Sequence, residues 1–202
     1  MKRGFSIIFL ISCSIASVGC SSFSNKGLKR ETVELNENNI YQLNGTYFNY
    51  ASAYYNEKIY PDSIAKKVNA YNLITANPIK LTRLDSLDLA SSTDSFSLRF
   101  IDTNQIEIKY FIGGRTLYTE IIPGKIKKGF FYLDNKFYKR NGIPFIWGGI
   151  ITEKKRIGIS EDNYLIVNTI YKSKGALLLF LLGGSESKAV YKIEKIPLTE
   201  KL

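Results

Sequence analysis

The chain has 202 residues, which is enough for one domain with a single core and too short for two ordinary domains. It carries 28 Lys or Arg against 18 Asp or Glu, a formal net charge of +10, and 45% of its residues are hydrophobic, so the composition is that of a packed globule. Two Cys cannot build a disulfide framework or a four-ligand zinc site, and the absence of His removes the commonest general base and metal ligand.

The first twenty residues have the layout of an export signal. Lys2 and Arg3 precede an apolar stretch, residues 5–18, that is shorter than the ~20 residues needed to cross a bilayer. The segment ends in Ser-Val-Gly-Cys at residues 17–20, which resembles the lipobox of bacterial lipoproteins. A second match ends at Cys13, but its apolar core is shorter than the ~7 residues that an export signal needs, so Cys20 is preferred.

The lipoprotein resemblance implies a location for the protein. Residues 1–19 would be a signal peptide, and Cys20 would carry thioether-linked diacylglycerol as the membrane anchor. By the same resemblance, Ser21 after the modified Cys favours the outer membrane of the cell envelope. Residues 20–39 are polar and charged, which is typical of a flexible tether, so we expect one domain over residues 40–202.

One helix is expected near the start of that domain. Pro61, Asp62 and Ser63 suit the first turn of a helix, and Pro78 ends it. Between them one apolar stripe with helical spacing contains Ile64, Val68 and Tyr71.

The rest of the domain alternates apolar and polar residues with period two, which predicts short β-strands. Turn signals separate the strands at residues 102–104, 113–114, 123–124, 134–135, 141–142, 162–163 and 183–184. This spacing predicts an all-β fold, an antiparallel up-and-down meander. Because seven or more strands would leave exposed edges, we expect the sheet to close into a barrel, with a β-sandwich as the alternative.

A short motif lies at the start of the expected domain, where apolar residues become frequent. In residues 41–47 (YQLNGTY), Gly45 and Tyr47 resemble the G-x-W start of lipocalins and related calycins. The resemblance implies that Tyr47 closes one end of an eight-stranded barrel. A barrel of that size is either filled by side chains or holds one ligand.

Basic residues gather in three groups with aromatic residues between them. In an exported protein such groups indicate anionic lipid head groups rather than nucleic acid. The alternative is that they are solvent-facing strand residues that protect sheet edges. The head-group candidates are Lys125, Lys127, Lys128, Lys154, Lys155 and Arg156.

Two apolar segments need a partner. Residues 142–150 contain the only Trp, and Trp147, Phe145 and Tyr47 are the candidates for a hydrophobic-ligand site or lid; the alternative is a plug that caps the barrel. Residues 176–182 are apolar throughout, which predicts a strand buried on both faces and covered by the helix. The alternative is a docking surface for another envelope protein.

No catalytic motif is present in the sequence. It has no His for a Ser-His-Asp triad, and it lacks a G-x-S-x-G elbow, a Walker loop and a G-x-G-x-x-G loop. We therefore expect a non-enzymatic lipoprotein without metal or cofactor, which binds a small hydrophobic ligand or lipid. The alternatives are a structural or partner-binding envelope protein with a solid core and, least favoured, an enzyme that uses Lys, Asp, Glu or Tyr.

Overall fold

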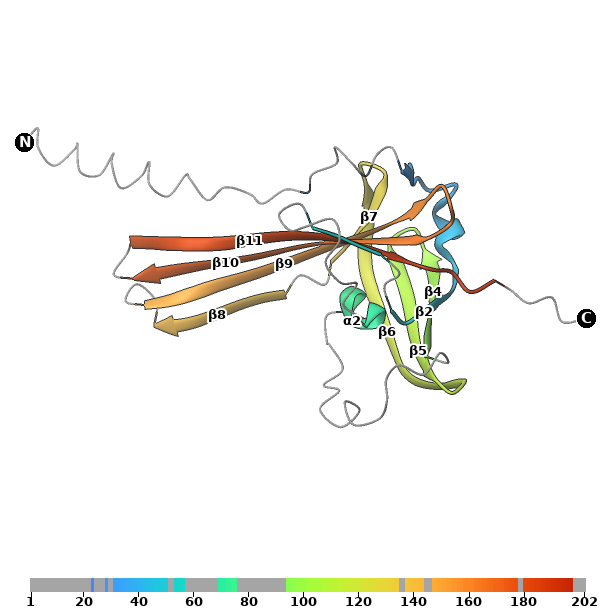
Figure 1. The fold of residues 1–202 in the computed structure, drawn as a ribbon, viewed down its shortest axis with the longest axis horizontal. Helices are drawn as coiled ribbons and strands as arrows, with labels where there is room; N and C mark the ends of the chain where they lie inside the picture. Colours follow the sequence, from blue (N-terminus) through green and yellow to red (C-terminus); the bar gives the residue numbers. More distant parts are fainter. Residues whose placement is uncertain are drawn as a thin grey trace, which may run out of the picture.

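The computed structural model describes residues 23, 28, 31–50, 53–56, 69–75, 94–134, 137–143, 147–177 and 180–197 (Figure 1). These residues form an all-β fold with one short α-helix and one 3-10 turn. The elements are β1 (Thr32–Val33), η2 (Ile40–Leu43), β2 (Gly45–Phe48), β3 (Ala53–Asn56), α2 (Ala70–Ile74), β4 (Ser95–Asp102), β5 (Gln105–Ile112), β6 (Arg115–Lys127), β7 (Phe130–Leu133), β8 (Phe137–Ile143), β9 (Trp147–Ser160), β10 (Leu165–Leu177) and β11 (Phe180–Ile193).

The strands form one antiparallel sheet in the order β2-β4-β5-β6-β7-β9-β10-β11-β3. On one side β9 pairs with β10 along its whole length, and on the other side it pairs in succession with β8, β7 and β1. The predicted all-β antiparallel meander is therefore confirmed. The described strands belong to one sheet rather than to the two separate sheets of a β-sandwich.

The predicted closure of the sheet into a barrel is wrong. In the described part of the chain, β2 meets the segment after β11 only through an isolated bridge between Tyr47 and Lys195 and the backbone hydrogen bonds beside it. The reason is a mismatch of lengths. Strands β2 and β3 have 4 residues each, whereas β9 and β11 have 14. At ~3.3 Å per residue the long strands extend about 45 Å, whereas β2 and β3, at the two ends of the sheet order, extend about 13 Å each and cannot close on the whole length.

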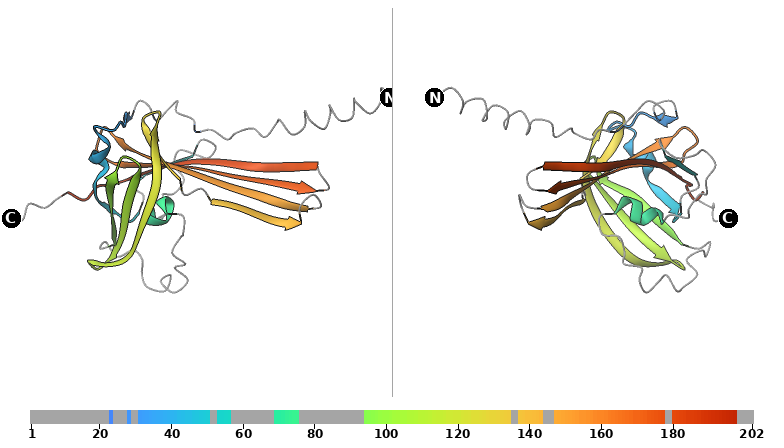
Figure 2. Two further views of the ribbon diagram at one scale, coloured as in Figure 1. Left: turned by 180° about the vertical axis from the view of Figure 1, so that it is seen from behind. Right: turned by 60° about the vertical axis from the view of Figure 1, so that its left-hand side comes forward.

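Figures 1 and 2 show the consequence: the outer halves of β9, β10 and β11, together with β8, project from a curved body as a long ribbon. We call this ribbon the arm. It consists of the paired residues 137–143, 147–153, 171–177 and 180–187. The body contains β2, β4, β5, β6, β7 and the inner halves of the three long strands.

The core lies inside the curved body, where α2 packs against the sheet (Figure 1). The Tyr71 ring of α2 lies 5.2 Å from that of Tyr110, and the Tyr47 ring stacks on Phe96 at 5.5 Å. Alternate residues of β4 and β5 point inward, as the period-two pattern predicts. They are Phe96, Leu98, Phe100, Ile106, Ile108 and Tyr110.

The predicted helix is confirmed over Ala70–Ile74, where Asn69 caps the first turn by accepting a hydrogen bond from the Asn72 backbone. The predicted start at residues 61–68 and the stop at Pro78 lie outside the described residues. The helix lies beside the body, away from the end of the arm (Figure 1). The expectation that it covers residues 176–182 is therefore wrong.

Those residues do not form one strand either. Leu177 pairs with Phe180, so the apolar run contains the turn of the β10–β11 hairpin. The predicted turns at 141–142 and 183–184 instead lie inside β8 and β11. The turn at Gly113–Gly114 is confirmed, and both glycines have positive φ, 55° and 79°.

The predicted turn at Pro123-Gly124 is also wrong, because β6 continues through it. Pro123 pairs with Gln105 of β5, and Gly124 pairs with Leu133 of β7, so β6 changes partner at this point. A Cβ at Gly124 would lie 2.5 Å from the Phe131 ring and from the Tyr132 carbonyl oxygen. This glycine allows two strands to approach closely and does not reverse the chain.

The folded region begins earlier than residue 40. Thr32 and Val33 pair with Ser160 and Ile159 of β9, and Leu35 is buried. The tether prediction is therefore wrong for these residues. The signal segment and Cys20 lie outside the described residues, so lipidation stays a prediction. No helix within the described ranges has the length and apolarity to cross a membrane.

Candidate functional site

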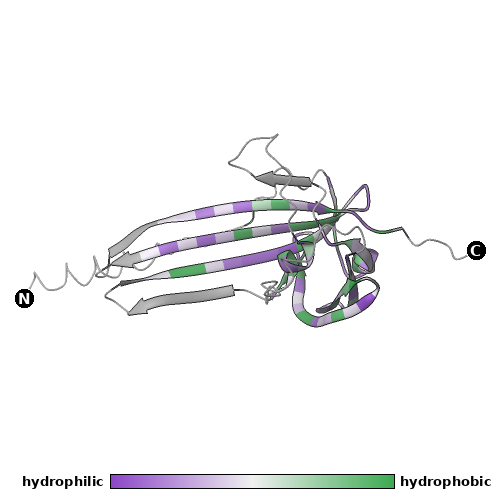
Figure 3. Ribbon diagram, turned by 60° about the horizontal axis from the view of Figure 1, so that its bottom comes forward, coloured by the Kyte–Doolittle hydropathy of each residue, from purple (hydrophilic) through white to green (hydrophobic). Residues whose placement is uncertain are grey.

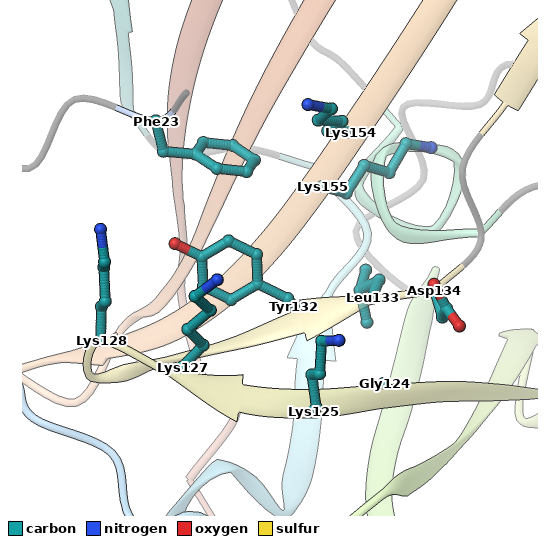
Figure 4. Close-up of a pocket in the computed structure, with 10 residues that line it drawn as sticks. All are labelled: Phe23, Gly124, Lys125, Lys127, Lys128, Tyr132, Leu133, Asp134, Lys154 and Lys155. Atoms are coloured by element: carbon teal, nitrogen blue, oxygen red, sulfur yellow. The ribbon is translucent and has the colours of Figure 1, made fainter. Parts of the chain in front are cut away.

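A cavity of about 450 Å³ lies where β6, β7 and β9 meet (Figure 4). We call it the basic pocket, because five lysines line it against one acidic residue. Its lining residues are Phe23, Gly124, Lys125, Lys127, Lys128, Tyr132, Leu133, Asp134, Lys154 and Lys155.

The lysines of the basic pocket come from two segments. Lys125 and Lys127 lie two residues apart on β6 and so share a face, and Lys128 follows in the turn, where its φ is 54°. All three are exposed. Lys154 belongs to β9 on the opposite side of the pocket (Figure 4). The pairing of Tyr132 with Arg156 holds β7 against β9 and so brings the two basic segments together.

Aromatic rings form one wall of the basic pocket. The Phe23 ring meets that of Tyr132 edge-on, with the ring centroids 5.4 Å apart. Figure 4 shows the two rings beside each other at the pocket. Behind them lies the fully buried Arg156, whose guanidinium is 4.4 Å from the Phe23 centroid and 4.1 Å from that of Phe130. Arg156 Nη1 donates a hydrogen bond to the Tyr132 hydroxyl at 3.2 Å. These contacts fix a cation and two rings beside the lysines.

Lys155 differs from the other lysines, because it is only 5% exposed and its ammonium points to α2. Its Nζ donates to the Thr75 carbonyl at 2.8 Å and to the Asn72 carbonyl at 3.5 Å. It also lies 3.6 Å from Glu153 Oε1. Burial lowers the pKa of Lys155, and the Glu153 carboxylate opposes that effect. Lys155 therefore ties the end of α2 to β9, and its side chain forms part of the pocket lining.

Five of the six residues predicted to contact head groups line this one cavity. The sixth, Arg156, lies behind its aromatic wall, and burial lowers its pKa. Tyr132 belongs to the aromatic residues that the sequence places near the basic groups, whereas Phe23 was not predicted here, because residues 20–39 are expected to form a flexible tether. The available signal was an aromatic residue within an otherwise polar stretch.

Of the three candidates for a hydrophobic-ligand site, the structure describes Tyr47 and Trp147, and these two do not come together. Tyr47 is fully buried in the core and donates a hydrogen bond to the Leu43 carbonyl at 2.6 Å, and burial raises its pKa. Trp147 begins β9 at the far end of the arm, where it pairs with Ile143 and Leu177. Phe145 lies outside the described residues, so the ligand or lid role of these residues stays a prediction.

The arrangement at the basic pocket suits an anionic ligand with an apolar part. Ammonium groups bind phosphate or carboxylate oxygens, and ring faces cover carbon chains. Within the described ranges, no group of three His, Cys, Asp or Glu residues is placed to hold a metal ion. No protein-family model, no curated protein and no solved structure matches this chain.

Proposed function

We propose that this protein is a non-enzymatic lipoprotein of the cell envelope, anchored in the outer membrane through Cys20, whose basic pocket binds the anionic head group of a lipid. The observation that carries the proposal is the position of Phe23. It packs against Arg156 and Tyr132 at the pocket, and it follows Cys20 by only three residues. Three residues span at most about 11 Å. A lipid-modified Cys20 would therefore hold the pocket at the level of the head groups.

The charge of the pocket supports the same ligand. Lys125, Lys127 and Lys128 are exposed on one rim, and Lys154 lies on the other. A lysine close to an anionic membrane surface contributes about 1 kcal/mol to binding. Four lysines so near the anchor would hold the body in one orientation, since acyl chains alone leave a protein free to rotate. The phosphate of one lipid would lie between the two rims, with Phe23 and Tyr132 against its apolar part.

The anchor is tested by metabolic labelling with palmitate. Cys20→Ser should abolish incorporation of label and detergent partitioning, whereas Cys13→Ser should leave both unchanged. Unchanged labelling of the Cys20→Ser variant would overturn the proposal that Cys20 carries the lipid anchor.

The pocket is tested separately, on Cys20→Ser protein expressed without residues 1–19, which retains every described residue. We expect binding to phosphatidylglycerol vesicles and little binding to phosphatidylcholine vesicles. The triple variant Lys125→Ala/Lys127→Ala/Lys128→Ala should bind about a hundredfold more weakly, as expected for three membrane-proximal charges that each contribute about 1 kcal/mol.

The matched control removes the same number of positive charges from another part of the body. Arg99, Lys109 and Arg115 belong to β4, β5 and β6, and Arg99 and Lys109 both contact Glu107. Their triple alanine variant should bind nearly as well as the parent. Equally weakened binding in both triple variants would mean that net charge alone attracts the protein to the vesicles. That result would overturn the proposed role of the basic pocket.

A further inference from the structure

The four strands of the arm end together, and their registers place the last residues in cross-strand rows (Figures 1 and 2). The outermost row pairs Ile143 with Trp147, Trp147 with Leu177, and Leu177 with Phe180. The second row contains Gly142, Gly148, Ala176 and Leu181. The third row contains Asn141, Gly149, Gly175 and Leu182. We call these three rows the tip.

The tip contains no charged residue, and the rows that follow it do. The fourth row contains Arg140 and Lys174, and the fifth contains Lys139. Acidic residues begin only in the sixth and seventh rows, with Glu186 and Glu153. Further toward the body, hydrophilic residues recur along the coloured lengths of β10 and β11 (Figure 3). From its end inward, the arm therefore changes from apolar to cationic to mixed charge.

We propose that the tip inserts into the surface layer of an anionic lipid bilayer, with Arg140, Lys174 and Lys139 at the level of the phosphates. At ~3.3 Å per residue, three rows extend about 7–10 Å, which matches the 5–10 Å burial of membrane-surface elements. This depth is far short of the ~30 Å hydrocarbon core of a bilayer, so the arm rests in one leaflet.

The order of chemistry along the arm selects lipid over protein. A bilayer presents hydrocarbon, then phosphate, then water, and the tip, the cationic rows and the mixed rows correspond to these layers one by one. A second copy of the chain meeting tip to tip would offer apolar residues but no anionic groups to the cationic rows, whereas an anionic bilayer offers both.

This contact is separate from the basic pocket. Along β9, Trp147 and Lys154 are seven residues apart, which corresponds to about 23 Å. Neither Cys20 nor the pocket lysines belong to the tip, so the inference does not depend on the proposed function.

Trp147 is the only Trp of the chain, and its place in the outermost row makes its fluorescence a direct measurement. The Cys20→Ser protein without residues 1–19 is mixed with phosphatidylglycerol or phosphatidylcholine vesicles. With phosphatidylglycerol we expect a blue-shifted emission and stronger quenching by acyl chains brominated near the head group than by chains brominated near the methyl end. Unchanged emission in vesicle-bound protein would overturn the proposal.

Variants separate the tip from the rest of the surface. Leu177→Ser/Phe180→Ser should reduce quenching by brominated lipid at least tenfold. The matched control Ile101→Ser/Leu117→Ser replaces two apolar side chains that are each 45% exposed on the body, and it should leave quenching unchanged. Replacing Lys139, Arg140 and Lys174 with Ala should weaken binding about fivefold for each cation.

Two further outcomes are decisive. The triple variant of Lys125, Lys127 and Lys128 should keep Trp147 quenching at saturating vesicle concentration, so that failure of the pocket and failure of the tip are distinguishable. A blue shift that appears without vesicles and grows with protein concentration would show that the tip packs against a second copy, and would overturn the proposal.

Discussion

The guanidinium of Arg156 lies 4.4 Å from the ring centroid of Phe23, and it joins the segment after Cys20 to the middle of β9. Arg156 is fully buried and also lies 4.1 Å from the Phe130 ring. A planar cation between two rings gains both dispersion and electrostatic energy where water is excluded. This contact holds Phe23 against the sheet, and the three-residue separation from Cys20 sets an upper limit of about 11 Å on the distance from Phe23 to the predicted anchor.

A double-mutant cycle measures that contact. Phe23→Ala and Arg156→Met should each lower the free energy of unfolding, and their interaction energy should be about 1–2 kcal/mol, as for desolvated cation–π pairs. Urea denaturation of the two single variants and the double variant gives the value. Strictly additive effects would show that Phe23 does not depend on Arg156.

Gly124 should tolerate no side chain. Gly124→Ala would place a Cβ 2.5 Å from the Phe131 ring and the Tyr132 carbonyl, so β6 and β7 would have to separate. We expect a loss of about 2–4 kcal/mol in the free energy of unfolding, as for other overpacked core positions. Gly149→Ala is the control, since its nearest contact is an ordinary 3.5 Å, and it should change stability by about 0.5 kcal/mol or less. Equal effects of the two variants would contradict this account of β6.

Stability should fall in alkaline solution because of buried phenols. Burial raises the pKa of Tyr71 and of Tyr110 from 10.0 to about 12, and both side chains are almost fully buried. Between pH 10 and 12 the unfolded chain loses these protons while the folded protein keeps them, so the stability present below pH 10 is lost as the pH rises. Each phenol contributes about 2–3 kcal/mol to the loss.

Urea denaturation at several pH values, with tyrosinate absorbance as a second signal, tests this. Tyr110→Phe should reduce the alkaline loss, although it also removes the hydrogen bonds with Asp94 and Asn49. A stability profile that stays flat up to pH 12 in the parent would refute the assignment.

Lys155 should contribute to stability rather than to lipid binding. Lys155→Met removes the donor to the Thr75 and Asn72 carbonyls and leaves buried oxygen atoms without it. We expect the free energy of unfolding to fall by about 1–3 kcal/mol, with vesicle binding nearly unchanged. Lys127→Met, which replaces an exposed lysine on the rim of the basic pocket, is the control, and the opposite pattern is expected of it, with weaker vesicle binding and little change in stability. A reversed result for the two lysines would show that their assigned roles are wrong.

Local patterns in the sequence predicted the strands of the body and the exposed position of the basic residues beside them, but not β8 or the rest of the arm. The alternation at Ile106, Ile108 and Tyr110 predicts a strand with one buried face, because successive side chains point to opposite sides of a sheet. The grouping of Lys125, Lys127 and Lys128 likewise predicts a cationic surface, since neighbouring residues remain neighbours in any fold.

Only the tertiary structure decided which segments meet. Glycine signals at Gly124 and Gly184 were predicted as turns, but both residues lie inside strands where another backbone passes close by. The hairpin that pairs Leu177 with Phe180 has no turn signal in its sequence. Phe23 belongs to a polar segment whose sequence does not predict its contact with Tyr132. Strand pairing joins residues far apart in the chain, and local residue preferences carry no information about that choice of partner.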